Sequence, residues 1–128
     1  RCSYFGEIMT ATIKKRGAVG AVIDGYMRDT RQVLEQNFPV FSMGRDAQGS
    51  GYRNQVINYG CPVEIGNIKI NPGDIIFGDI DGVVVIPKEI EEKAISITLA
   101  KVRGERDTRA AIEDGMSAVD AVKNFGVF

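Results

Sequence analysis

The sequence of 128 residues contains no histidine. Histidine is the usual general base near neutral pH and the commonest zinc ligand. Its absence excludes Ser-His-Asp and Cys-His catalytic triads as well as imidazole metal sites. Any catalysis must therefore use carboxylates, Lys, Arg, Tyr, Cys, backbone amides, or a hard cation such as Mg²⁺ held by oxygen.

Cysteine, net charge and long apolar runs are also scarce. Cys2 and Cys61 are far apart and fit neither a CxxC motif nor a zinc site, so we expect reduced thiols in a cytoplasmic protein. The net charge of −1 gives no reason to expect binding to nucleic acid or to an anionic membrane. No apolar run approaches the roughly 20 residues of a membrane span. The composition suits one globular domain with a hydrophobic core.

The first third of the chain is predicted to alternate helices and strands. Ser3 can cap an amphipathic helix that Gly17 ends. The continuous apolar run at 18–23 is typical of a strand covered on both faces. A short helix is expected over 30–36, followed by a strand at 38–42 whose proline favours an edge position.

The rest of the chain predicts a layer of hairpins and then helices. Segment 44–54 contains Gly and Ser but lacks the flanking strand and helix of a phosphate-binding loop, so we interpret it as a flexible connection. Residues 55–87 alternate β-branched residues with turn signals. An amphipathic helix is expected over 88–115, and Ser117 can cap a last short helix. The sequence thus predicts an α/β fold.

Two oppositely charged residues follow the first buried strand, which we expect to end at Asp24-Gly25. Ligands of open α/β folds bind beyond the carboxyl ends of the strands, where Arg28 and Asp29 would lie. The planar fork of arginine suits a carboxylate or an enolate oxygen, and aspartate offers oxygen to Mg²⁺ or Mn²⁺. The alternative is an ordinary surface ion pair, which contributes little.

The start of the first helix is a second candidate element. Gly6 allows close approach of the backbone, and the free N–H groups of a helix start attract anions. The segment Gly6, Glu7, Ile8 and Met9 could therefore receive a substrate carboxylate. The alternative is a helix start without a binding role.

Four segments resemble the RraA-like family: YFGEIMTATIKKRGAVGAVIDGYMRD, FPVFSMG, PGDIIFGDIDGVVVIP and GMSAVDAVKNFGVF. This family includes class II 4-hydroxy-4-methyl-2-oxoglutarate/4-carboxy-4-hydroxy-2-oxoadipate aldolases and regulators of ribonuclease E activity. The most specific feature is Gly6, separated by twenty-one residues from Arg28-Asp29. The similarity extends over nearly the whole chain, which we treat as a single RraA-like domain, residues 1–128.

The resemblance implies a swivelling β/β/α domain assembled as a homotrimer or as a hexamer of two trimers. It also implies a metal-dependent lyase that cleaves or decarboxylates a 2-oxo (di)carboxylic acid through a pyruvate enolate, with oxaloacetate decarboxylation as a side activity. The family's metal ligand, for Mg²⁺ or Mn²⁺, falls on Asp29 and its enolate-stabilising arginine on Arg28. Its amides for the substrate carboxylate fall on Gly6 to Met9. This chemistry needs neither histidine nor a Schiff-base lysine.

The sequence departs from the aldolases of the family in two places. The aldolases carry an acidic residue three positions after the metal aspartate, where this chain has Gln32; Glu35, one helical turn further, is a candidate substitute. Members also have a substantial segment before the equivalent of Arg1, so we expect a fragment. Trimeric members borrow a carboxylate from a neighbouring subunit for proton transfer, and Glu105 is our candidate for that catalytic role.

Two other functions stay open. One is a non-catalytic RraA-type protein that binds and inhibits ribonuclease E; Gln32 favours it, whereas the presence of Arg28 and Asp29 favours an enzyme. The other is a sugar-acid lyase or another keto-acid enzyme that shares the metal site but not the substrate.

Overall fold

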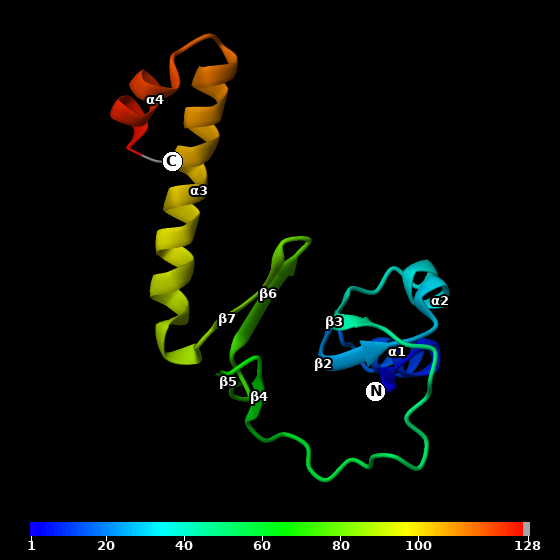
Figure 1. Cartoon of the computed structure of the whole chain (residues 1–128). Helices are drawn as coiled ribbons and strands as arrows, with labels where there is room; N and C mark the ends of the chain where they lie inside the picture. Colours follow the sequence, from blue (N-terminus) through cyan, green and yellow to red (C-terminus); the bar gives the residue numbers. More distant parts are fainter. Residues whose placement is uncertain (127–128) are drawn as a thin grey trace. The chain divides into compact units, whose positions relative to one another are not determined.

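The computed structural model describes residues 1–126 and forms two compact units, Arg1–Val85 and Ile86–Phe128 (Figure 1). The first unit is a mixed α/β structure. Its elements are β1 (Ser3–Phe5), α1 (Glu7–Lys15), β2 (Ala21–Met27), α2 (Thr30–Glu35), β3 (Val40–Arg45), β4 (Val63–Ile65), β5 (Ile68–Ile70), β6 (Ile75–Asp79) and β7 (Gly82–Ile86).

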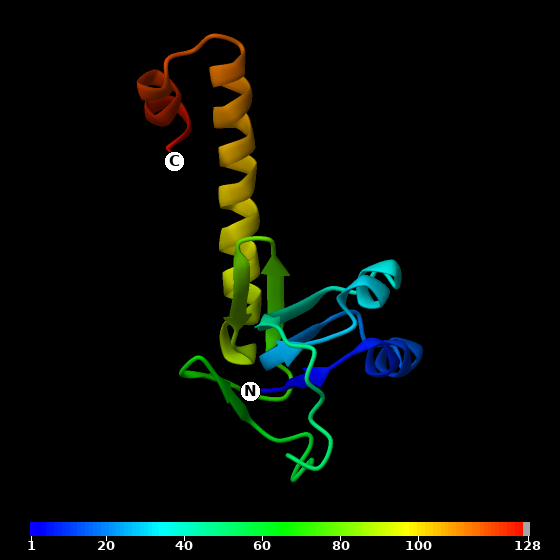
Figure 2. The ribbon, with the colours of Figure 1, turned by 45° about the vertical axis from the view of Figure 1, so that its right-hand side comes forward.

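A parallel sheet of order β1-β2-β3 supports the candidate site. Met27, the last residue of β2, pairs with Phe5 of β1 and with Arg45 of β3. The carboxyl ends of the three strands therefore meet at one edge, and the residues that follow them start side by side. Figure 2 shows α1 continuing from β1, with α2 beside it.

A small hydrophobic core supports the edge where the three strands end. Phe5, Met27, Val33 and Phe38 are buried and pack together, so β1, β2, α2 and the entry to β3 all contribute to it. Partly buried side chains of α1 and β2, among them Ile13, pack against this cluster. Burial of large apolar side chains is the main favourable term in folding, so this cluster stabilises the ends of the strands.

The prediction that Ser3 caps the first helix is wrong. Ser3 lies in β1, is 2% exposed, and donates its hydroxyl to the carbonyl of Gln48 at 3.1 Å. Helix α1 begins only at Glu7, after Gly6. Ile8 and Met9, two apolar residues of this helix, are exposed. Residues 3–5 pair with β2 as a strand, and the helix is shorter than predicted for this reason.

The first long strand also ends later than predicted. It continues through Asp24-Gly25 to Met27. Gly25 is buried, and a side chain there would overlap the ring of Tyr4. This glycine therefore serves close packing of β1 on β2 and does not mark a turn. The site residues still follow the strand directly.

The other strands of the first unit form two hairpins, as predicted. β4 and β5 pair antiparallel, and β6 and β7 form a separate two-stranded sheet. Gly78 of β6 lies against the ring of Phe41 of β3, where an added Cβ would be 2.6 Å from Cζ. The missing side chain of Gly78 thus lets the second hairpin pack on the parallel sheet.

The second unit is helical. It contains the short 3₁₀ helix η1 (Lys88–Ile90), α3 (Glu91–Glu113) and α4 (Ala118–Phe125). The hydroxyl of Ser117 accepts a hydrogen bond from the Asp120 amide at 3.2 Å, which confirms the predicted cap. The helices pack through small buried side chains, Thr108 and Ala121. None of the helices within residues 1–126 is long and apolar enough to span a membrane.

Candidate functional site

The edge of the sheet positions Arg28 and Asp29. The Arg28 amide donates to the carbonyl of Phe5 at 2.9 Å, so pairing of β1 with β2 extends to the first site residue. Asp29 then adopts a left-handed backbone, with φ 55° and ψ 36°, and precedes α2. Only glycine enters this region routinely, but aspartate tolerates it better than most residues. The turn directs the Asp29 carboxylate toward α1.

The carboxylate of Asp29 meets the start of α1. Its Oδ2 accepts a hydrogen bond from the Glu7 amide at 3.2 Å and lies 3.4 Å from Nε of Arg28. Gly6 permits this approach, because a Cβ at this position would lie 2.5 Å from the same oxygen. The backbone of Gly6 is extended, at φ −155°. Glycine is therefore needed here to leave room for the Asp29 carboxylate, and not because the backbone has a conformation that only glycine adopts.

The first turn of α1 presents backbone amides at the same place. The first intrahelical bond runs from the Thr10 amide to the Gly6 carbonyl, at 3.0 Å. The amides of Ile8 and Met9 precede this bond and have no acceptor within the helix. The Glu7 amide is taken by Asp29, so within the first turn of α1 the amides of Ile8 and Met9 remain for a carboxylate.

Arg28 and Asp29 line two adjacent cavities. The smaller has a volume of about 100 Å³ and lies toward α1. It is lined by Ser3, Tyr4, Phe5, Gly6, Ile8, Met9, Arg28, Asp29 and Ser50. The larger, of about 330 Å³, lies toward the end of β3 and is lined by Met27, Arg28, Asp29, Thr30, Arg45, Asp46 and Ala47.

Sequence reasoning missed the contribution of the loop after β3. We interpreted residues 44–54 as a flexible connection, yet Gly49 pairs with Ser3 in a parallel bridge and lies against the Arg28 guanidinium. Ser50 lines the smaller cavity. The only signal in the sequence was the glycine itself, because Ser3, the residue that holds the loop, lies 45 residues before Gln48 in the chain.

The donor atoms at this edge fit a hard cation that keeps most of its water. Among residues 1–126, no group of three or more His, Cys, Asp or Glu side chains could hold a metal ion. An all-protein zinc site is therefore absent from the described part of the chain. Mg²⁺ commonly binds one or two carboxylates, with water and substrate oxygens as the other ligands. Asp29, with Oδ1 outside the contacts described above, fits this mode.

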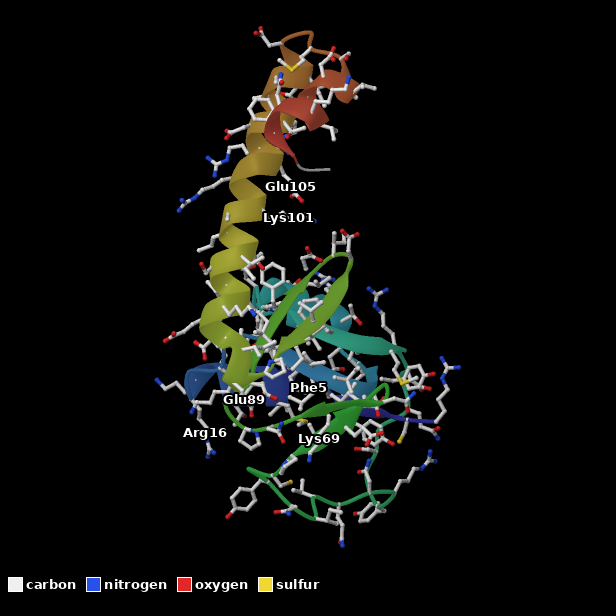
Figure 3. The ribbon with its side chains drawn as sticks, turned by 90° about the vertical axis from the view of Figure 1, so that its left-hand side faces the viewer. Phe5, Arg16, Lys69, Glu89, Lys101 and Glu105 are labelled. Carbon is white, nitrogen blue, oxygen red and sulfur yellow. The ribbon has the colours of Figure 1, made fainter. Side chains whose placement is uncertain are left out.

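The other acidic candidates lie apart from the Arg28–Asp29 pair in the chain. Glu105 lies on α3 in the second unit, where its carboxylate is 3.6 Å from Nζ of Lys101 (Figure 3). Glu35 pairs with Arg31 at 2.9 Å, and both side chains are exposed. Neither Glu35 nor Gln32 lines either cavity, so Glu35 does not take the place of the acidic residue that we expected at position 32.

Comparisons with known proteins identify the family and the fold of the chain. A family model described as RraA-like (Aldolase/RraA) matches residues 1–85, which is the first unit. A protein of Halalkalibacterium halodurans named "Putative 4-hydroxy-4-methyl-2-oxoglutarate aldolase" is 35% identical over 116 residues, which cover 91% of this chain and 55% of that protein.

Two crystal structures share the fold. An uncharacterized protein from Pseudomonas syringae pv. tomato has a TM-score of 0.90 at 35% identity, over 94% of this chain and 60% of that one. Streptomyces coelicolor RraAS2, an unusual member of the RNase ES inhibitor RraA family, has a TM-score of 0.73 at 24% identity, over 84% of this chain and 55% of its own. This chain spans little more than half the length of each of these three proteins. It belongs to the RraA-like family.

Proposed function

We propose that this chain carries the site of a divalent-metal-dependent carbon–carbon lyase that cleaves or decarboxylates a 2-oxo (di)carboxylic acid through a pyruvate enolate. The observation that carries the proposal is the convergence of Arg28, Asp29 and the first turn of α1 on one small cavity. The name of the Halalkalibacterium halodurans relative supports the same class of reaction.

Each group at the cavity has a part in this reaction. The amides of Ile8 and Met9 bind the substrate carboxylate at the positive end of α1. The guanidinium of Arg28 has five N–H donors; its Nε lies 3.4 Å from Oδ2 of Asp29, and we assign the donors of the two Nη atoms to the keto oxygen. This fixed positive charge stabilises the oxygen as negative charge develops on it, and such preorganised donors are worth about 10²–10³ in rate. A divalent cation on Asp29 would supply Lewis-acid polarisation of the same oxygen.

The two cavities support a substrate that carries an acid group at each end. The smaller cavity has a volume of about 100 Å³, so it favours a small acid such as one of pyruvate size. The larger cavity shares Arg28 and Asp29 and adds Arg45, an exposed arginine without an ion pair to the described residues. Arg45 could receive a second carboxylate, which favours a dicarboxylic substrate.

A direct test is pyruvate release from oxaloacetate and from 4-hydroxy-4-methyl-2-oxoglutarate, with and without Mg²⁺. We expect release that requires the cation and that Asp29→Ala abolishes. The matched control is Asp24→Ala, which removes an exposed carboxylate of β2 that lines neither cavity. Pyruvate formation that survives Asp29→Ala would remove Asp29 from the reaction, and its absence from the unmodified chain would contradict the proposal.

The second candidate function is a non-catalytic protein that binds and inhibits ribonuclease E. Gln32, in place of the acidic residue that the aldolases carry, favours it, and the family name of the Streptomyces coelicolor relative supports it. A pull-down with the scaffold region of ribonuclease E separates the two functions when it is paired with the pyruvate assay. Binding without pyruvate formation would favour the regulator, and pyruvate formation without binding the lyase.

A further inference from the structure

We infer that Gly49 is a positioning residue for Arg28, an inference that rests on the proposed function. The loop after β3 presses its backbone against the Arg28 guanidinium at this glycine. A Cβ at Gly49 would overlap Nη1, and Cζ would be 3.7 Å from it. Gly49 lies outside the left-handed region of backbone conformation, so its backbone does not oppose alanine. Among the described residues other than its chain neighbours, the only atoms that an added Cβ would meet within 4 Å belong to the Arg28 side chain. The missing side chain of Gly49 thus sets where the guanidinium lies.

The loop cannot easily retreat from Arg28, because both of its sides are tied down. On one side, the amide of Ser3 donates to the Gln48 carbonyl at 2.7 Å and its hydroxyl donates to the same oxygen at 3.1 Å. On the other side, the Asp46 amide donates to the carbonyl of Met27 at 3.0 Å. Asp46 also accepts the Gln48 amide at 2.9 Å, which closes the turn between the two anchors.

The side chain of Arg28 is the softer partner in this contact. It is 47% exposed, and its guanidinium is the free end of a long side chain. A methyl group at Gly49 would therefore displace the guanidinium and leave the fold intact. The displacement matters for the reaction, because donors act only when aimed at the oxygen on which charge develops, and errors of about 1 Å can cost about 10²-fold in rate.

The chain offers a matched control two residues further along the same loop. Gly51 also lies outside the left-handed region, and a Cβ there would meet no atom within 4 Å. Gly49→Ala and Gly51→Ala carry the same effect on the entropy of the unfolded chain, so a difference between them reports the contact with Arg28.

The test combines crystal structures of the two variants with steady-state kinetics on oxaloacetate and Mg²⁺. In Gly49→Ala we expect a displaced Arg28 guanidinium, an unmoved loop backbone, and a kcat lower by roughly 10- to 100-fold with a much smaller change in KM. Gly51→Ala should match the unmodified chain in both respects. A loop that moves while the guanidinium stays in place would overturn the inference, as would an unchanged kcat despite a displaced guanidinium.

A double variant separates positioning from general damage to the fold. When Arg28 is already replaced by lysine, the guanidinium that Gly49 seats is gone, so adding Gly49→Ala should lower kcat no further. An equal loss in both backgrounds would mean a structural defect and overturn the inference. If the unmodified chain forms no pyruvate, the proposed lyase fails, and the crystal structures alone decide whether Gly49 sets the position of Arg28.

Discussion

Asp29 combines a strained backbone with a carboxylate that serves another helix. Its left-handed conformation costs on the order of 1 kcal/mol for a residue other than glycine. Its side chain makes no cap for α2, the helix it precedes, and instead accepts the Glu7 amide of α1. Strain of this kind persists where the surroundings impose it, often at functional sites. Both features aim the carboxylate at the smaller cavity, which agrees with the metal-binding role we propose for it.

Gly6→Ala should displace this carboxylate without unfolding the chain. The extended backbone of Gly6 accepts alanine, but the new Cβ would lie 2.5 Å from Oδ2 of Asp29. We expect a higher Mg²⁺ concentration for half-maximal pyruvate formation and a thermal midpoint close to that of the unmodified chain. An unchanged Mg²⁺ titration would show that the approach of Asp29 to α1 has no part in metal binding.

Among the elements, β1 contributes most to the site for its size. Its three residues pair with β2, and the carbonyl of Phe5 accepts the amide of Arg28. Ser3 anchors the loop after β3, and Gly6 leads from the strand into α1. The backbone of β1 therefore links the helix start, the arginine and the loop into one frame. A strand of three residues can link these parts because its first residue bonds to the loop after β3 and its last residue bonds to Arg28.

The cap of α4 gives a test of stability at the scale of one element. Ser117→Ala removes the acceptor of the Asp120 amide and should cost about 1 kcal/mol in the free energy of unfolding. Ser117→Thr should retain most of it, because threonine keeps a hydroxyl that can accept the Asp120 amide and donate to the Asp120 carboxylate. Urea denaturation and hydrogen exchange of the Asp120 amide measure the effect. An alanine variant as stable and as protected as the unmodified chain would contradict the role of the cap.

Elements with local signals could be predicted from the sequence. The helix at 30–36, the β6–β7 hairpin and the Ser117 cap depend on turn residues, caps and periodicity within a few residues. Strand β1 and the anchored loop could not be predicted, because Ser3 and Gln48 are 45 residues apart in the chain. The candidate site residues show the same difference between local and long-range signals. Arg28 and Asp29 could be named as candidates from their place after a strand and from the family resemblance. Gly49 could not, because its proposed role depends on its contact with Arg28.

At the scale of the whole molecule, the candidate residues divide between the two units. Gly6 to Met9, Arg28 and Asp29 belong to the first unit, which the family model covers, and Glu105 belongs to the second. We propose that the chain assembles as a homotrimer or hexamer and that Glu105 of one subunit transfers protons at the site of another. Light scattering of the purified protein measures the mass of the assembly.

Mixed assemblies test the role of Glu105. We expect Glu105→Gln to lower kcat by about 10²-fold or more, as the loss of a general acid or base does. Glu113→Gln, on the same helix, serves as the control. Mixing Glu105→Gln with Arg28→Ala should restore part of the activity, because some sites then combine an intact arginine with an intact glutamate. A wild-type kcat in Glu105→Gln would contradict its catalytic role, and a lack of restoration would contradict its action across subunits.

The proposed function requires that one small 2-oxo acid is held between the first turn of α1 and the pair Arg28 and Asp29. A crystal structure with pyruvate and Mg²⁺ tests it most directly. We predict the pyruvate carboxylate on the amides of Ile8 and Met9, its keto oxygen facing the guanidinium of Arg28, and the cation on Asp29. Pyruvate bound elsewhere while this cavity stays empty, or a cation bound away from Asp29, would contradict the account.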